Sequence, residues 1–172
     1  METILKPTQV FYLEMRNNPV ITNAISPDFT IKELPHPIAP QFYRELYFGV
    51  GKKWNWLDRM VISEEELAQK INAPQVHIFT LHWQGSLAGF AEFVVETDHV
   101  EILYFGLLPD FTGKGLGPQL LQWAIQQAWS YQRPRIQLNT CSLDHPGALQ
   151  VYKNAGFREV RTETQERRVL AN

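Results

Sequence analysis

Three glycines at every second position have the spacing most suggestive of chemistry in this chain. Gly113, Gly115 and Gly117 stand between an apolar strand pattern and a segment with an amphipathic helical pattern. A glycine loop that leads into a helix N-terminus leaves several backbone N–H groups unpaired at the positive end of the helix dipole. Because glycine has no Cβ, that backbone can approach phosphate oxygens closely. The spacing therefore predicts an anion cradle for a nucleotide-containing cofactor.

The same spacing excludes two common phosphate-binding loops. The dinucleotide fingerprint G-x-G-x-x-G needs its third glycine at the position where this chain has Pro118. The P-loop ends in Gly-Lys-Ser or Gly-Lys-Thr, and neither tripeptide occurs here. The pattern [QR]-x-x-G-x-[GA] fits instead, from Thr112 to Gly117. In this segment the chain resembles the pyrophosphate loop of the GNAT N-acetyltransferase superfamily.

A second segment carries the same resemblance. The superfamily signature [ND]-x-x-A-x-x-[LV]-Y-x-x-x-G-F is matched downstream by Ala148, Val151, Tyr152, Gly156 and Phe157. The resemblance implies an α/β (α+β) GNAT fold, in which a central mixed, mostly antiparallel sheet splays between its two central strands and is flanked by about four helices. It also implies a single domain over residues 1–172, with an acetyl-CoA-binding core at about 100–157 and an extra N-terminal strand at about 8–16.

The resemblance implies that the chain transfers the acetyl group of acetyl-CoA to a primary amine by direct attack in a ternary complex. The pantetheine arm would lie along an open sheet edge at Phe105, Gly106 and Leu107. His145 stands where the family often has an Asn that contacts pantetheine. Thr112 replaces the usual Gln or Arg, so it lacks a charge that Lys114 can supply. The pyrophosphate-binding positions carried over from the family are Leu108, Thr112, Gly113, Lys114, Gly115, Leu116 and Gly117.

Two residues are the candidates for proton transfer. Tyr152 matches the family tyrosine near the cofactor sulfur, and a phenol with a pKa of about 10 is a suitable acid for a thiolate leaving group. Glu101 begins the strand ahead of the glycine loop, where several family members have a general base. Strand alternation predicts that one face of this strand carries Glu101, Leu103, Phe105 and Leu107. Glu92 on the preceding strand and an ordered water remain alternative bases.

The amine acceptor is expected to bind within residues 42–60, where the family usually builds this site. Trp54 and Trp56 are two positions apart beside Gly-Lys-Lys and would form an apolar wall with polar ends. Arg59 would pair with a substrate carboxylate, or Asp58 with its ammonium. Alternatively, both Trp cover the sheet and Asp58–Arg59 is a local ion pair. Tyr104 would line the acceptor pocket or belong to the core.

The acceptor itself stays open between a small molecule and a peptide or protein amine. Two other functions also stay open, namely a catalytically weak acyl-CoA-binding or sensing module, and a transferase of a longer acyl group. The Thr112 substitution favours the binding module, whereas Glu101 and Tyr152 favour turnover.

Alternating apolar residues predict the strands, and apolar residues with helical periodicity predict the helices, that must position these side chains. Ser63 opens a capping box, Gln84-Gly85-Ser86 suits a hairpin turn, and Asp144 with Pro146 suits a helix start that Gly156 ends. Strands are expected at 9–15, 29–34, 75–83, 87–96, 100–108, 135–141 and 158–164, and helices at 41–48, 63–71, 115–131 and from 144.

Composition bounds the class of protein. The 172 residues suit one domain, and 16 basic against 18 acidic residues give a net charge of −2 without a basic run, so nucleic acid is not expected as a partner. No apolar segment approaches the roughly 20 residues of a membrane span. The single cysteine, Cys141, excludes an intramolecular disulfide and suits the cytoplasm. We expect no metal site, no membrane partner, and a monomer or homodimer.

Overall fold

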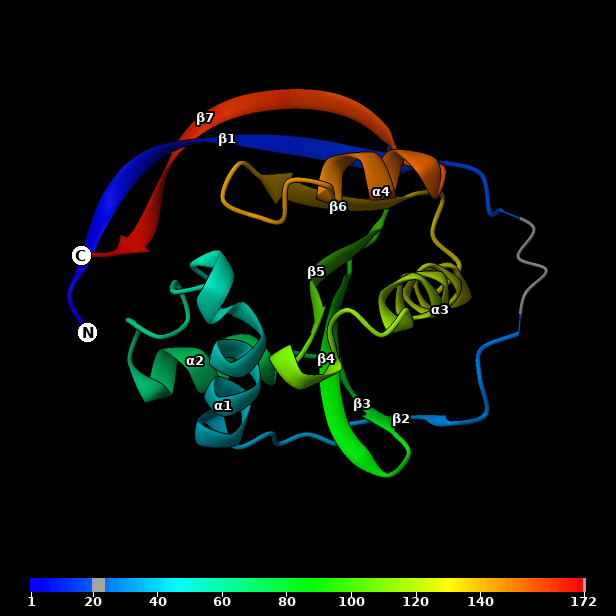
Figure 1. Ribbon diagram of the computed structural model, residues 1–172, viewed down its shortest axis with the longest axis horizontal. Coiled ribbons are helices and arrows are strands. Elements are labelled where there is room, and N and C mark those ends of the chain that lie inside the picture. Colours follow the sequence, from blue (N-terminus) through cyan, green and yellow to red (C-terminus); the bar gives the residue numbers. More distant parts are fainter. Residues whose placement is uncertain (20–23, 172) are drawn as a thin grey trace.

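The computed structural model describes residues 1–19 and 24–171, and within them seven strands form one sheet (Figure 1). The strand order across the sheet is β2-β3-β4-β5-β6-β1-β7. Every neighbouring pair is antiparallel except β5 and β6, which are parallel. The strands are β1 (Thr3–Met15), β2 (Phe29–Glu33), β3 (Val76–Trp83), β4 (Ser86–Val95), β5 (Val100–Leu107), β6 (Ile136–Cys141) and β7 (Arg158–Leu170).

The sheet is splayed at its centre, which confirms the expected GNAT architecture. Strands β5 and β6 pair only at Val100 with Ile136 and at Glu101 with Gln137. Beyond these two pairs their facing edges diverge. A wedge therefore opens in the sheet between β5 and β6.

Helices cover the sheet on both faces, as Figure 1 shows for α1 and α2 against α3. One core packs under α3 and includes Leu13, Phe93 and Leu138, while the other packs under α1 and α2 and includes Tyr43, Ile78 and Phe90. The helices are α1 (Pro40–Gly51), α2 (Glu64–Ile71), α3 (Leu116–Ser130) and α4 (Ala148–Asn154), with short 3-10 turns η1 (Lys52–Trp54) and η2 (Pro109–Phe111). None of the helices in the described residues has the length and apolar character needed to cross a membrane.

The expected N-terminal strand exists, but it is longer than predicted and lies inside the sheet. Strand β1 pairs with β7 from Thr3–Leu170 to Glu14–Arg158, whereas β6 reaches only residues 10–15 of β1. The remaining halves of β1 and β7 form a two-stranded ribbon that arches past the end of β6 (Figure 1). The ribbon returns to η1, because the Leu170 N–H donates to Asn55 Oδ1 at 3.2 Å.

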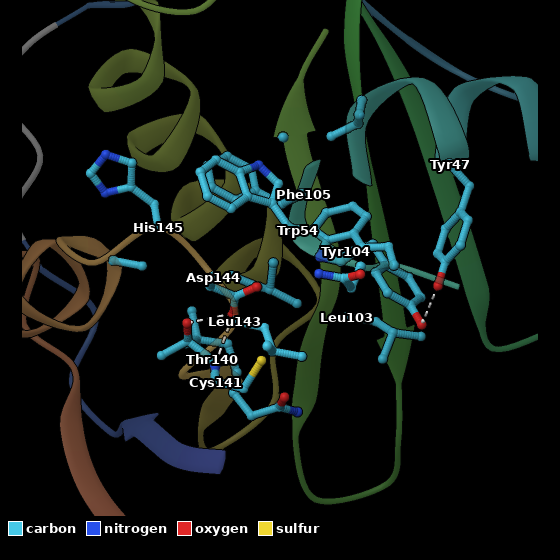
Figure 2. Close-up of a pocket in the computed structure, with 18 of the residues that line it drawn as sticks. Tyr47, Trp54, Leu103, Tyr104, Phe105, Thr140, Cys141, Leu143, Asp144 and His145 are labelled. Carbon is cyan, nitrogen blue, oxygen red and sulfur yellow. Dashed lines mark hydrogen bonds between the residues drawn. The ribbon is translucent and has the colours of Figure 1, made fainter. Parts of the chain in front are cut away.

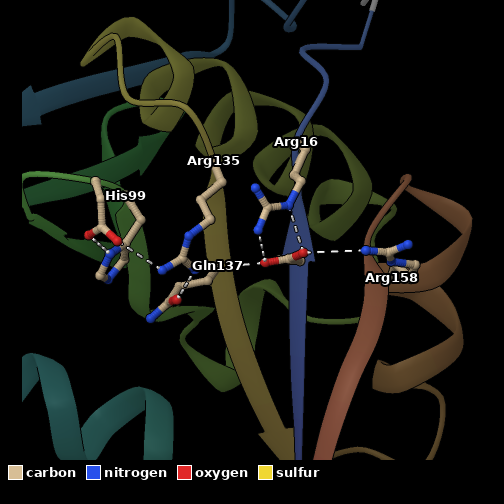
Figure 3. A network of polar contacts seen from close by, with 7 residues as sticks. Arg16, His99, Arg135, Gln137 and Arg158 are labelled. Atoms are coloured by element: carbon tan, nitrogen blue, oxygen red, sulfur yellow. Dashed lines mark hydrogen bonds and ion pairs between the residues drawn. The ribbon is translucent and has the colours of Figure 1, made fainter.

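An ion cluster ties together β6, β1 and β7, the three strands at one edge of the sheet (Figure 3). Glu14 of β1 accepts from Arg16 Nε at 2.9 Å and lies 3.5 Å from Arg158 Nη2 of β7 and 3.8 Å from Arg135 Nη1. The Arg16 hydrogen bond is the largest influence on the pKa of Glu14, which these arginines lower although burial opposes them. Arg135 Nη1 also donates to Gln137 of β6 at 2.7 Å.

Local predictions held at some element ends and failed at others. Ser63 caps α2 by accepting from Glu66 N at 3.0 Å, as the capping box predicted. Helix α1 does not end before Gly49 but continues to Gly51. Asp144 is not the N-cap of α4. Its Oδ2 instead accepts from Thr140 Oγ1 at 2.6 Å and from Cys141 N at 2.9 Å, so it secures the end of β6.

Candidate functional site

A pocket of about 310 Å³ opens between the diverging edges of β5 and β6 (Figure 2). Residues 102–107 of β5 form one wall and residues 138–141 of β6 form the other. One end of the pocket is lined by Thr112, which precedes α3, and by Gly117 in the first turn of that helix. The other end is lined by Tyr47 of α1 and by Trp56 and Asp58 of the segment that follows α1. We call these the cofactor end and the acceptor end. The pocket therefore connects the predicted anion cradle to the predicted acceptor segment.

The glycine loop at the cofactor end has the space that an anion needs. A Cβ built at Gly113, Gly115 or Gly117 would meet nothing within 4 Å. Gly115 is the N-cap of α3 with a left-handed φ of 74°, which glycine adopts without strain. Within the described residues, no N–H from Gly113 to Gly117 donates to a backbone carbonyl outside helices and strands. These donors at the N-terminus of a 15-residue helix suit a pyrophosphate.

The remaining predicted pyrophosphate positions differ in their exposure and in their hydrogen bonds. Thr112 Oγ1 donates to Pro109 O at 2.8 Å, and Lys114 is exposed with its Nζ 5.6 Å from the Phe111 ring centroid. Leu116 is buried, so only its backbone faces the loop. Leu108 departs from the expectation, because its N–H donates to Ala88 O at 2.7 Å and is not available to an anion.

The predicted pantetheine positions lie on the open edge of β5. Phe105, Gly106 and Leu107 all line the pocket, and Phe105 also packs against the core under α3. A Cβ on Gly106 would come within 2.6 Å of Val50 of α1, so glycine allows this strand to lie directly under the helix. An extended arm can add along such an unpaired edge through backbone hydrogen bonds.

A β-bulge overturns the predicted alternation in β5. Glu92 faces Tyr104 across the β4–β5 ladder and Phe93 faces Ile102, so Leu103 is an extra residue. Because one inserted residue exchanges the faces, Glu101 shares its face with Tyr104 and not with Phe105 and Leu107. Glu101 is not among the residues that line the pocket. Burial raises the pKa of its carboxyl, although His99 and Gln137 oppose that shift.

Tyr152 lies where both signatures converge. It projects from α4, lines the pocket and packs against the core under α3, with its ring centroid 6.2 Å from that of Phe157. Burial, assisted by the charge of Asp144, raises the pKa of Tyr152 to about 12. The phenol is therefore protonated at neutral pH and able to act as an acid.

His145 and Trp54 meet from opposite sides of the pocket (Figure 2). His145 belongs to the loop between β6 and α4, whereas Trp54 belongs to η1, and their ring centroids are 5.8 Å apart. The Gly147 N–H donates to His145 Nδ1 at 2.9 Å and fixes the ring. The contact joins the two halves of the splayed sheet beside the pocket.

Aromatic rings build the wall of the acceptor end. The ring centroid of Tyr104 is 4.9 Å from that of Tyr47 and 5.1 Å from that of Trp56, and all three residues line the pocket. The two tyrosine hydroxyls are 3.5 Å apart (Figure 2). Burial raises the pKa values of Tyr47 and Tyr104, so both phenols are neutral. Such a wall suits an apolar portion of a small ligand.

Arg59 and Glu92 depart from their expected contact with the acceptor. Arg59 is 9% exposed and Glu92 is fully buried, and neither lines the pocket. Arg59 Nη1 lies 2.9 Å from Glu92 Oε1 and 2.8 Å from Oε2, while the Tyr43 hydroxyl donates to Oε1 at 2.6 Å. Burial raises the pKa of Glu92 against the influence of Arg59 and Tyr43. The pair supports the aromatic wall from beneath, since the Arg59 guanidinium lies 5.1 Å from the Tyr104 ring centroid.

Sequence reasoning missed several pocket residues, including Asn139, Cys141 and Arg167. A strand was expected at 158–164, but β7 continues to Leu170. Nothing in the local pattern indicated that this strand pairs with β1. That pairing is what brings Arg167 to the acceptor end.

The chain is similar to known proteins across most of its length. The Acetyltransferase (GNAT) family matches residues 36–157. A mycothiol acetyltransferase from Clavibacter michiganensis subsp. michiganensis (strain NCPPB 382) is 28% identical over 105 residues. That match covers 61% of this chain and 34% of the relative, so the matched region corresponds to about a third of that protein.

Solved structures share the fold. A putative acetyltransferase of the GNAT family from Novosphingobium aromaticivorans DSM 12444 is 16% identical with a TM-score of 0.63, over 99% of this chain and 68% of that one. An aminoglycoside acetyltransferase from an uncultured soil metagenomic sample is 15% identical with a TM-score of 0.57, over 76% of this chain and 89% of that one.

Proposed function

The chain belongs to the GNAT acetyltransferase family of acyltransferase enzymes, and from this premise we propose that it transfers the acetyl group of acetyl-CoA to the primary amine of a small molecule or peptide. The observation that carries the proposal is the continuity of the pocket. One cavity joins the open glycine cradle, the unpaired edge of β5, Tyr152 and an aromatic wall. A module that only binds acyl-CoA has no need for the acceptor end.

The pocket residues fit the cofactor in two respects. The free amides around Gly115 and the N-terminus of α3 would hold the pyrophosphate. The open edge of β5 at Phe105 and Leu107 would hold the pantetheine arm, with His145 beside it. When bound, acetyl-CoA supplies an activated acetyl thioester and a thiolate leaving group.

Two residues would manage the protons. Tyr152 lines the pocket and its raised pKa keeps the hydroxyl protonated, so this hydroxyl would donate a proton to the departing sulfur. Glu101 lies on the acceptor face of β5, the face of Tyr104, and its raised pKa makes it a stronger base than a solvated carboxylate. Because Glu101 does not line the pocket, it would accept the ammonium proton through water. Glu92 is less suited to this role, since it is buried against Arg59.

Similar proteins favour a small-molecule acceptor. One relative is named a mycothiol acetyltransferase, and one structural neighbour is an aminoglycoside acetyltransferase. The size of the pocket and its aromatic wall support an acceptor of that kind. Trp56 and Tyr104 would contact its apolar part, and Trp54 would lie beside the cofactor near His145.

Gly117→Val tests the proposal directly. Gly117 has ordinary helical backbone and open space in front of it, so a Val fits the fold but occupies the cradle. We expect acetyl-CoA affinity, measured by calorimetry, to fall at least about tenfold, which corresponds to roughly 1.4 kcal/mol. Gly85→Ala is the matched control, because it strains a left-handed turn (φ 83°) between β3 and β4 without touching the pocket.

Turnover separates the enzyme from a binding module. Free thiol release from acetyl-CoA should require an added amine in the wild-type protein. Unchanged affinity in Gly117→Val would refute the cradle. Tight acetyl-CoA binding without thiol release for any amine in a broad panel would refute the transferase.

A further inference from the structure

Four side chains with a full charge line the pocket in the described part of the chain, and two of them are already engaged. Asp144 accepts hydrogen bonds from Thr140 and Cys141, as described above. Arg168 Nη1 donates to Thr3 Oγ1 of the neighbouring strand at 2.8 Å. Asp58 and Arg167 are the other two, and within the described residues their only polar side-chain contact is with each other.

Their mutual contact leaves Arg167 largely unsatisfied. Arg167 Nη1 lies 3.8 Å from Asp58 Oδ2, which is too far for a hydrogen bond. Arg167 Nε is buried and has no hydrogen-bond partner. A buried guanidinium N–H without an acceptor is unfavourable. The Arg167 side chain is otherwise 30% exposed and that of Asp58 is 57% exposed, so both remain accessible from the pocket side.

Arg167 pairs with Lys6 in the ribbon of β1 and β7 and lines the pocket beside Asp58, and the charges of this pair act on groups of both walls. Burial and Asp144 raise the pKa of the Cys141 thiol on β6, and the positive charge of Arg167 acts in the opposite direction. Asp58, the ion partner of Arg167, contributes to the raised pKa values of Tyr47 and Tyr104 on the aromatic wall, although burial is their main cause. Arg167 therefore approaches the acceptor end from the ribbon of β1 and β7.

From this arrangement we infer that the acceptor amine also carries an anionic group, a carboxylate or a phosphate, and that Arg167 binds it. The inference rests on the proposed acetyl transfer and identifies the class of its acceptor. The two terminal nitrogens of the planar guanidinium form a fork that matches two oxygens of either anion. A bound anion would give these nitrogens the close acceptor that Asp58, at 3.8 Å from Nη1, does not supply.

The same charges disfavour two other classes of acceptor. A neutral amine offers the Arg167 guanidinium no anionic partner. A polycationic amine would place additional positive charge near Arg167 and Arg168. In the described part of the chain, two carboxylates line the pocket, and one of them, Asp144, is already hydrogen-bonded at the end of β6. Only the exposed Asp58 would then remain to bind the additional positive charge. Arg167 is thus a specificity-determining residue, and the chemistry of acetyl transfer does not depend on it.

Matched pairs of amines test the inference. Each pair differs only in the anionic group: glycine and glycinamide, β-alanine and its amide, phosphoethanolamine and ethanolamine. The measured quantity is the ratio of kcat/KM for the two members in wild type divided by the same ratio in Arg167→Met. Intrinsic differences in amine reactivity cancel in this double ratio.

We expect Arg167→Met to lower kcat/KM about 10- to 100-fold for the best anionic amine, the usual range for losing a hydrogen bond to a charged group. The neutral member should change little. Arg167→Lys should recover part of the loss, because it keeps the charge without the fork. Arg161→Met is the matched control on β7, because Arg161 pairs with Glu163 at 2.8 Å and does not line the pocket.

Binding without acetyl-CoA supplies a second readout. Calorimetric titration with the preferred anionic amine should show weaker binding to Arg167→Met than to wild type and to Arg161→Met. An equal loss of kcat/KM for both members of every pair overturns the inference and leaves the transferase intact. If no amine is acetylated, the proposed acetyl transfer is refuted. The titration alone then tests whether Arg167 binds an anionic group. Selective loss of binding in Arg167→Met would support that site, and equal binding would overturn it.

Discussion

The buried pair beneath the aromatic wall gives the sharpest test of the structural reasoning. Arg59→Met fills a similar volume but removes the cation beside Glu92, which is fully buried. Removing one partner of a buried ion pair typically costs about 3–5 kcal/mol, because the other charge is left uncompensated. Tyr43 would keep its hydrogen bond to Glu92, so the variant should fold with reduced stability.

The loss should depend on pH in a defined direction. Burial already raises the pKa of folded Glu92, and removal of Arg59 raises it further. The folded variant then keeps a proton that the unfolded chain releases above its ordinary pKa of about 4.3. Its stability is fully present below that pKa and falls by about 1.4 kcal/mol per pH unit as pH rises toward the folded pKa. The deficit relative to wild type should therefore be smallest near about pH 4 and approach its full value near neutrality.

Urea denaturation across this range measures the effect. Arg44→Met is the matched control, because Arg44 donates to Arg59 O at 3.2 Å and Ile62 O at 2.5 Å, and neither acceptor titrates. Its cost should not change with pH. The double variant Arg59→Met/Glu92→Gln should recover most of the loss, since no buried charge remains and the side-chain amide oxygen can still accept from the buried Tyr43 hydroxyl. A deficit in Arg59→Met that is equal at pH 4 and pH 7 would refute the reasoning.

Three further outcomes are expected. Tyr152→Phe should lower kcat by up to about 10²–10⁴-fold with little change in calorimetric acetyl-CoA affinity, and full activity would return Tyr152 to a packing role. Glu101→Gln should slow the reaction most at low pH, recover as pH rises, and affect a lysine-like amine more than an α-amino group. A pH–rate profile parallel to wild type for both amines would exclude Glu101 as the base. Glu14→Gln should cost about 1.5–3 kcal/mol in denaturation at pH 7. Because Arg16 and its neighbours lower the folded pKa of Glu14, that cost should disappear as pH falls from the unfolded value through the folded one, and a cost that persists in acid would contradict it.

The cofactor end was predictable because its determinants are local. The glycines of residues 113–117 and the helix that follows them are one continuous segment, so spacing alone indicates an anion cradle. The signature around Tyr152 is also continuous, and the structure places Tyr152 in the same pocket as Gly117. The capping residue Ser63 and the Gln84–Gly85 turn are similarly decided by neighbours in sequence.

The face of Glu101 was mispredicted because a bulge is not visible in an alternating pattern. Tyr104 and Phe105 both have apolar or aromatic side chains, so either parity of the strand looks acceptable in sequence. The pairing of Glu92 with Tyr104 and of Phe93 with Ile102 decides the parity, and that is a property of the β4–β5 ladder. The error for Arg59 also comes from a contact between distant parts of the chain, since its partner Glu92 lies 33 residues away.

The acceptor end is harder to predict because it is assembled from distant segments. Tyr47 belongs to α1 and Asp58 follows that helix, whereas Tyr104 belongs to β5 and Arg167 to the last strand, β7. Arg167 reaches the pocket only because the N-terminal half of β1 pairs with the C-terminal half of β7 and carries it past the end of β6. If Arg167 binds the acceptor as proposed, this division has a functional consequence. Substitutions in β7 would change which amine is recognised while the cradle and Tyr152 stay in place, so acceptor specificity and cofactor chemistry would vary independently on the same sheet.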